Sequence, residues 1–263
     1  MDNNSSGWII LIAILGAAAW IPHLVQLFLK IFTKPRLITV NQKEIEIGFN
    51  TLGPIINIGL AFLSERDKAL IQKISLQLKH SSQASHLFLW SWYEESLFQM
   101  DLPKASIPYK KTQTAIALNI VKDFMVEKKI GFQRKEFKEK LDEISKLVHE
   151  DYTNLKNTNE DIEKIKSTKN YNDLVNHFEN SFIWSIGKYT INIDIYVLNK
   201  KGSFTHKLEF ELNALNLMKL KDNIPLCKEN IDNILFTPEN SLEQNWQWVY
   251  CNDLKDSLNK NKN

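Results

Sequence analysis

The longest uncharged run in the chain lies near its N-terminal end, and it constrains the fold more than any other feature of the sequence. Residues 8–29 contain no Asp, Glu, Lys or Arg. As a helix with a rise of about 1.5 Å per residue, this run reaches roughly the 30 Å of a bilayer's hydrocarbon core. The sequence therefore predicts one transmembrane helix over 8–32, after a short non-cytoplasmic tail at 1–7.

A cleavable signal peptide is the alternative, because the alanines at 17–19 resemble a small-residue cleavage site. The residues before the run include Asp2 and no Lys or Arg, and the apolar stretch continues past the alanines. Both features favour a retained anchor. Lys30 and Lys34 follow the run and no basic residue precedes it, so the positive-inside rule predicts a cytoplasmic C-terminal domain.

Small and polar residues recur along one side of this predicted helix. At steps of three and four, Gly16, Ala19, His23 and Gln26 share a face. Small residues allow close approach of helices, and polar groups in lipid need partners. These four residues are therefore candidates for a helix–helix contact, with a second copy or with another membrane protein. In the alternative, His23 is reached by a local water defect and makes no specific contact.

Beyond residue 32, composition is that of an ordinary globular domain. The formal net charge of the chain is +2, which leaves no broad basic field, so no nucleic-acid partner is expected. The two cysteines, Cys227 and Cys251, are too few for an extracellular domain of this size held together by disulfides.

Apolar and polar residues alternate through much of 33–132, with a turn expected at 50–54. Strands that are apolar on one side and polar on the other are typical of antiparallel sheets packed face to face. We therefore expect a mainly β chain with inserted helices (α+β), built on an antiparallel, immunoglobulin-like β-sandwich. The apolar positions with shared parity include Ile45, Ile47, Phe49, Ile56, Ile58, Leu60, Phe62, Phe88, Trp90 and Trp92.

The spacing of apolar residues changes within 133–183, which we interpret as a helical insertion. Steps of four and three predict a helix from about Lys135 to Lys156. A second stripe runs from Tyr171 to Phe182, with Asn170 or Asn172 as its N-cap.

Alternation returns within 184–250 as a long β-hairpin around a turn at 199–203. Helices follow, the first of them capped by Asn213, and the chain ends in a polar tail at 251–263. We expect the hairpin and these helices to complete one β-rich domain interrupted by the helical insertion. Two β-rich lobes bridged by the helices remain the alternative.

Motifs for catalysis, cofactors or metals are absent from the sequence. The glycines do not cluster as in phosphate-binding loops, and HExxH, CxxC and GxSxG do not occur. His80 and His86 flank a Ser-rich turn without an evident third metal ligand. Asp123 with Glu136 and Lys138 superficially fits the acid and E-x-K pattern of metal-dependent nucleases, but E-x-K is common in helices rich in Lys and Glu. We therefore expect no catalytic residue, no cofactor and no metal.

Aromatic residues near the C-terminal end give the best indication of a binding surface. Trp246, Trp248 and Tyr250 alternate, which places them on one face of an extended segment. Such a face either fills the core, or contacts a partner peptide or a membrane surface.

These features predict a single-pass, membrane-anchored protein that presents a cytoplasmic, non-enzymatic, β-rich interaction or sensing module. Its expected partners are the lipid bilayer and either a protein or a second copy bound through the transmembrane helix. One alternative is a membrane-acting effector that oligomerises through that helix. The other is a membrane-tethered hydrolase with a site built from scattered residues.

Overall fold

The protein is mainly antiparallel β, with 48% of the chain in strands, and it also contains helices. The computed structural model describes residues 16, 18–28, 36–82, 84–102, 105–157, 162–198, 203–236, 245–252 and 255–256. The strands before the helical segment are β1 (Arg36–Asn50), β2 (Gly53–Glu65), β3 (Ala69–His80), β4 (Ser85–Leu102), β5 (Ala105–Thr114), β6 (Leu118–Ile120) and β7 (Met125–Arg134). Those after it are β8 (Gly187–Val197), β9 (Ser203–Leu212), β10 (Val249–Asn252) and β11 (Lys255–Asp256).

All the described strands belong to one sheet, in the order β10-β1-β2-β7-β4-β3-β8-β9-β11. β5 pairs with β4, and β6 pairs with β3. The two ends of this order approach each other, because β10 pairs with β1 while β11 pairs with β9. Thr39 Oγ1 of β1 also contacts His206 Nε2 of β9. The sheet is therefore nearly closed and barrel-like.

This single curved sheet overturns the prediction of an immunoglobulin-like sandwich. A sandwich and a closed sheet both place one face of every strand inside and the other outside. Alternation along the sequence is the same in the two folds, so it cannot distinguish them. Strands from both sides of the helical segment, β3 and β8, are neighbours in the sheet.

The core fills the inside of the sheet. Along β2, Ile56, Ile58, Leu60 and Phe62 are buried and alternate with outward-facing residues. Their partners on β1 and β7 include Ile47 and Phe132, which are also fully buried. The same parity rule therefore assigns Asn57, Gly59 and Ala61 of β2 to the outer face. Other inward-facing residues are Ile74, Leu76 and Leu78 of β3 and Ile191, Ile193 and Ile195 of β8.

A β-bulge changes the face on which one of the expected core tryptophans lies. The pairing of β4 with β7 shifts between Trp90 and Trp92. Trp90 is opposite the buried Phe132, whereas Trp92 is opposite Gly131 on the outer face. One extra residue in a strand reverses the side-chain alternation beyond it. The prediction that Trp90 and Trp92 share a face is therefore wrong.

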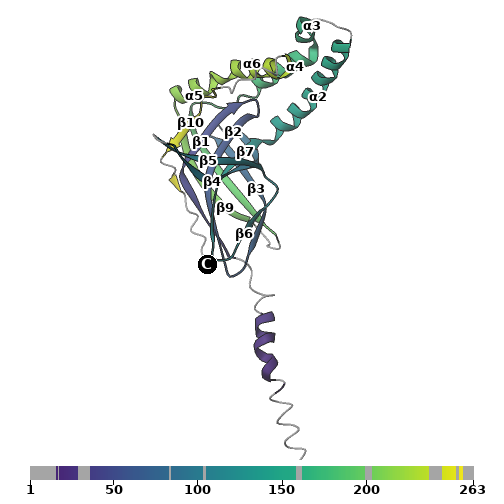
Figure 1. Cartoon of the computed structure of the whole chain (residues 1–263). Helices are drawn as coiled ribbons and strands as arrows, with labels where there is room; N and C mark the ends of the chain where they lie inside the picture. Colours follow the sequence, from purple (N-terminus) through teal and green to yellow (C-terminus); the bar gives the residue numbers. More distant parts are fainter. Residues whose placement is uncertain are drawn as a thin grey trace, which may run out of the picture.

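Helices lie over one end of the sheet, as Figure 1 shows for α2, α4, α5 and α6. Their apolar faces include Phe137 of α2, Phe178 of α4 and Ile231 of α6, all buried. The Phe137 and Phe178 rings are 5.6 Å apart at their centroids, in an edge-to-face arrangement. The helices are α2 (Lys135–Asn157), α3 (Ile162–Lys166), α4 (Lys169–Asn180), α5 (Ala214–Lys221) and α6 (Asn223–Phe236).

Two of the predicted helix starts are confirmed and one is wrong. α2 begins at Lys135, and Asn213 caps α5 by accepting a hydrogen bond from the Asn216 backbone N–H at 2.9 Å. α4, however, is capped by Thr168, whose hydroxyl accepts from the Tyr171 N–H. A hydroxyl serves as an N-cap much as an amide oxygen does, so several neighbouring residues were equally suitable from the sequence.

The prediction of a transmembrane helix over 8–32 is overturned. No helix in the parts of the chain that the structure describes has both the length and the apolar character to cross a membrane. Residues 18–28 are helical, which at 1.5 Å per residue gives about 16 Å, roughly half of a hydrocarbon core. The remainder of the predicted span, apart from Gly16, lies outside the described residues.

Candidate functional site

Glycines on the outer face of the sheet lie under large side chains. A Cβ added to any of three glycines would fall between 2.0 and 2.2 Å from a covering side-chain atom. Because glycine has no Cβ, the covering group rests directly on the strand. These pairs are Gly48 of β1 under Trp248, Gly59 of β2 under Gln42, and Gly131 of β7 under Trp92.

One row of paired residues crosses five adjacent strands on this outer face. It consists of Tyr250 of β10, Glu46 of β1, Asn57 of β2, Gly131 of β7 and Trp92 of β4. Paired residues on neighbouring antiparallel strands project side by side from the same face. The backbone register alone therefore brings a carboxylate, an amide and two aromatic side chains together, and we call this set the outer row.

Glu46 is the charged centre of the outer row, although it is only 8% exposed. Its Oε2 lies 2.5 Å from Nζ of Lys129 and accepts a hydrogen bond from Nδ2 of Asn57 at 2.8 Å. Burial raises the pKa of Glu46, but hydrogen bonds from Lys129, Asn57 and Tyr250 and the Lys129 charge together hold it below the ordinary value of 4.5. The carboxylate is therefore ionised at neutral pH and is a poor proton donor there.

The other amide atom of Asn57 has no partner. Asn57 is 5% exposed, and its buried Oδ1 accepts no hydrogen bond from any residue that the structure describes. A buried acceptor without a donor costs about 1–3 kcal/mol, so each native example calls for an explanation. Because this oxygen is buried, a ligand in a neighbouring groove cannot reach it without displacing residues of the outer row.

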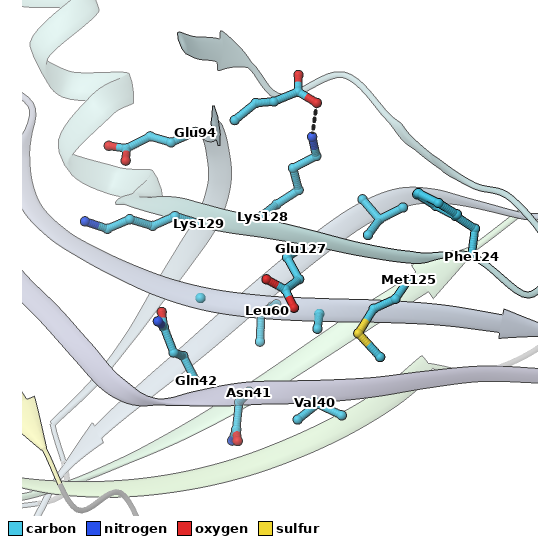
Figure 2. Close-up of a pocket in the computed structure, with 14 residues that line it drawn as sticks. Val40, Asn41, Gln42, Leu60, Glu94, Phe124, Met125, Glu127, Lys128 and Lys129 are labelled. Atoms are coloured by element: carbon cyan, nitrogen blue, oxygen red, sulfur yellow. Dashed lines mark hydrogen bonds and ion pairs between the residues drawn. The ribbon is translucent and has the colours of Figure 1, made fainter. Parts of the chain in front are cut away.

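A groove of about 820 Å³ adjoins the outer row and runs over β1, β2 and β7. Its floor is low at Ala61 of β2, which has a small side chain, whereas the neighbouring Gly59 is covered by the side chain of Gln42. Lys129 belongs both to the groove and, through Glu46, to the surroundings of the outer row. Figure 2 shows the walls, which include Val40, Asn41 and Gln42 from β1 and Met125, Glu127 and Lys129 from β7, with Phe124 just before β7.

The two ends of this groove differ in polarity. Gln42, Glu94 and Lys129 line one end, whereas the other end has Val40 and the residues at the start of β7. These apolar side chains are unusually exposed for their type, since Val40 is 54%, Met125 51% and Phe124 64% exposed. Apolar surface of this kind in a groove is typical of a binding site.

The lysine that projects into the groove already has an acidic partner. Lys129 pairs with Glu46, whereas Lys128 is opposite the inward-facing Leu60 and pairs with Glu95 on the other face of the sheet. Figure 2 shows Lys128 directed away from Glu127. Glu127 is exposed and forms no ion pair within the described part of the chain. The groove therefore carries more negative than positive charge.

The residues considered for metal binding do not come together. Within the ranges that the structure describes, no group of three or more His, Cys, Asp or Glu side chains could hold a metal ion. His80 Nδ1 bonds to the Ser82 hydroxyl at 2.8 Å. Asp123 precedes β7 and Glu136 follows it, so the ten-residue strand Met125–Arg134, about 33 Å long, separates them.

The aromatic residues predicted to form a binding surface divide between two environments. Trp248 lies over Gly48, and Tyr250 is 55% exposed in the outer row. Trp246, by contrast, is half-buried and packs against the core. Whether these residues bind a partner stays a prediction, but two of the three adjoin the candidate site.

The residues predicted to form a helix–helix contact lie in the helical segment at residues 16 and 18–28. Gly16, Ala19, His23 and Gln26 are all exposed there, and a Cβ on Gly16 would have no atom within 4 Å. The His23 ring lies 6.1 Å from that of Trp20. Self-association through these residues stays a prediction, without the membrane-spanning setting in which it arose.

Glu46, Asn57, Lys129 and Glu127 were not predicted from the sequence to be site residues. A usable signal was present in β2, where Asn57, Gly59 and Ala61 interrupt an apolar run at every second position. Small and polar residues at that period predict a shallow, polar strip on one face of a strand. The contribution of β7 could not be found in this way, because its pairing with β2 is not evident from the sequence.

No family model matches the chain, and no curated protein matches it. Among solved structures, it is similar to a family 123 glycoside hydrolase from Clostridium perfringens, studied for the hydrolysis of glycolipid glycans. The identity is 8% over 68% of this chain, with a TM-score of 0.32. The chain spans 27% of that enzyme's length, and a similarity this weak supports no conclusion about fold or function.

Proposed function

We propose that the chain is a non-enzymatic interaction module that binds a partner in the groove over β1, β2 and β7. The observation that carries this proposal is the low floor at Ala61, which lies between the exposed side chains of Val40 on β1 and Glu127 on β7. A concave surface with exposed apolar groups and a few fixed polar groups is the usual form of a binding site.

The ionisation of the nearby acids favours binding over catalysis. General acid catalysis at neutral pH needs a carboxyl whose pKa is raised toward 7. The pKa of Glu46 is instead lowered, and Glu95 is paired with Lys128. These groups are suited to fixing charge and geometry in the sheet.

Filling the floor of the groove tests this proposal. Ala61→Phe places a large side chain on the low floor of the groove, and Thr190→Phe makes a comparable change on the outer face of β8, away from the groove. Random peptides displayed on phage would be selected on the immobilised full chain, and the affinity of enriched peptides measured by fluorescence polarisation. We expect A61F to weaken their binding about ten-fold or more, equivalent to about 1.4 kcal/mol, while T190F leaves it unchanged.

Two outcomes would contradict the proposal. One is that no peptide is enriched by the wild-type chain, and the other is that enriched peptides bind A61F as tightly as wild type. Circular dichroism and thermal unfolding of both variants show whether the sheet is intact, so a loss of binding through misfolding is recognised.

A further inference from the structure

We infer that the groove binds an extended peptide segment with a Lys or Arg side chain and, two residues away, a large apolar side chain. This inference rests on the proposed function and specifies the chemistry of its ligand. It follows from the charge of the groove, the distance between two side chains on its β7 wall and the shape of its floor.

The charge of the groove favours a ligand that carries a cationic group. Glu127 is exposed in the groove and has no ion-pair partner within the described ranges, whereas Lys129 is neutralised by Glu46. A ligand cation placed against Glu127 gains an ion pair without breaking an existing one. An anionic ligand would instead be repelled by Glu127 and would have to displace Glu46 from Lys129. The groove therefore discriminates against anions as well as attracting cations.

The distance between Glu127 and Met125 determines where the apolar side chain of the ligand lies relative to its cationic group. Glu127 and Met125 are two residues apart on β7, so both project from the outer face, about 7 Å apart along the strand. Figure 2 shows both side chains extending from β7 toward β2. Residues i and i+2 of an extended peptide have the same separation and also point to one side. A cationic residue opposite Glu127 thus places the i+2 residue opposite Met125, which is exposed, as is Phe124 directly before it in the chain.

The floor favours a polypeptide main chain. With the small Ala61 beneath, a strand-like ligand can approach the sheet surface closely. At the polar end, the side-chain oxygen of Gln42, which lies over Gly59, is a hydrogen-bond acceptor. Amide N–H groups and a guanidinium or ammonium group are donors that match such an acceptor.

Four synthetic peptides and three protein variants test this ligand class. The parent peptide has Arg-Ser-Phe at the centre of a Ser/Gly background; the others replace Arg by Glu, replace Phe by Ser, or place Arg and Phe next to each other. Fluorescence polarisation with the full chain should show the parent binding about ten-fold tighter than each of the three controls. In the adjacent arrangement both side chains are retained but face opposite sides, so this peptide isolates the effect of spacing.

The protein variants test which residue of the groove contacts the basic side chain of the ligand and which contacts the apolar one. Glu127→Gln should weaken the parent about two- to five-fold, as for an exposed ion pair. The same variant should bind the peptide with Glu in place of Arg no more weakly than wild type does, because the repulsion between the two carboxylates is removed. Met125→Ser should weaken the parent about ten-fold but hardly change the peptide lacking Phe. Glu211→Gln, on the outer face of β9, is the matched charge control and should change neither. Raising the salt concentration should weaken the parent more than the peptide lacking Arg.

The outcomes separate this inference from the proposed function. Peptides that are selected in the groove and blocked by Ala61→Phe, but that have no basic residue two positions from an apolar one, overturn the ligand class and leave the function intact. Equal binding of all four synthetic peptides also overturns it. Concentration-dependent dimerisation in sedimentation experiments that is abolished by A61F would identify a second copy as the occupant, and would likewise overturn it.

Discussion

Replacing Gly131 by alanine should destabilise the sheet, because Trp92 occupies the space that the new methyl group needs. A Cβ at this position would lie 2.0 Å from Cε2 and 2.2 Å from Nε1 of the indole ring. Non-bonded carbon atoms prefer about 3.5–4.0 Å. The ring must therefore move by more than about 1 Å, which lifts it off the strand.

The change in the free energy of unfolding combines one stabilising effect with two destabilising ones. Alanine is favoured over glycine within a strand by roughly 0.5–1 kcal/mol, since the unfolded chain loses less freedom. A tryptophan buries about 150–250 Å². Re-exposing about a third of that, roughly 70 Å², costs about 1.7 kcal/mol at 25 cal/mol per Å², and overpacking adds about 1–3 kcal/mol where the ring cannot move freely. We expect a net destabilisation of about 2 kcal/mol.

Urea denaturation followed by circular dichroism measures this change, and tryptophan fluorescence reports the displaced ring. Gly59→Ala is the matched control, because its Cβ would lie closest to the flexible amide end of Gln42, at 2.1 Å from Oε1, and less close to the Gln42 Cβ, at 2.9 Å. It should therefore cost less than Gly131→Ala. In a Trp92→Ala background, Gly131→Ala should become neutral or stabilising. Were G131A to destabilise equally with and without Trp92, steric conflict with the ring would not be the cause, and the reasoning would be refuted.

Three other predictions concern ionisation and helix packing. The pKa of Glu46 is lowered from 4.5 in the folded chain. The ionised carboxylate therefore stabilises the folded state above pH 4.5, and this stabilisation is lost as the pH falls through the pKa of the folded chain. Glu46→Gln should reduce the pH dependence of the free energy of unfolding in urea below pH 5. Burial raises the pKa of Cys227 to about 12 and of Cys251 to about 11, so neither thiol should react with Ellman's reagent at pH 8 before the chain unfolds. The Tyr171 hydroxyl of α4 donates to Asp232 of α6, and Tyr171→Phe should lower stability by about 1–2 kcal/mol in thermal unfolding, with unchanged far-ultraviolet circular dichroism.

Local features of the fold were accessible from the sequence because they depend on neighbouring residues. The spacing of apolar residues predicts α2, and Asn213 predicts the start of α5, since a cap needs only the next three residues. The hairpin of β8 and β9 is likewise evident from alternation on both sides of one turn.

Features that depend on the pairing of distant strands could not be predicted from the sequence. One extra residue in a strand is enough to reverse the face on which the following side chains lie. The bulge beside Trp90 moves Trp92 from the inside to the outside, and nothing in the local composition marks it. The outer row depends on the pairing of β1 with β10 and of β2 with β7, which joins Glu46 to Tyr250 and Asn57 to Gly131 across long stretches of sequence. A pattern of apolar and polar residues specifies a face, but it does not specify the neighbouring strand.

The near-closure of the sheet has a consequence for how the chain is made. β10 and β11, which pair with β1 and β9, are synthesised about two hundred residues after β1. Until then, the nascent chain presents two open sheet edges, and such edges can pair with other chains. Folding on the ribosome should therefore end with closure of this seam, and conditions that delay its synthesis should favour aggregation over the native sheet.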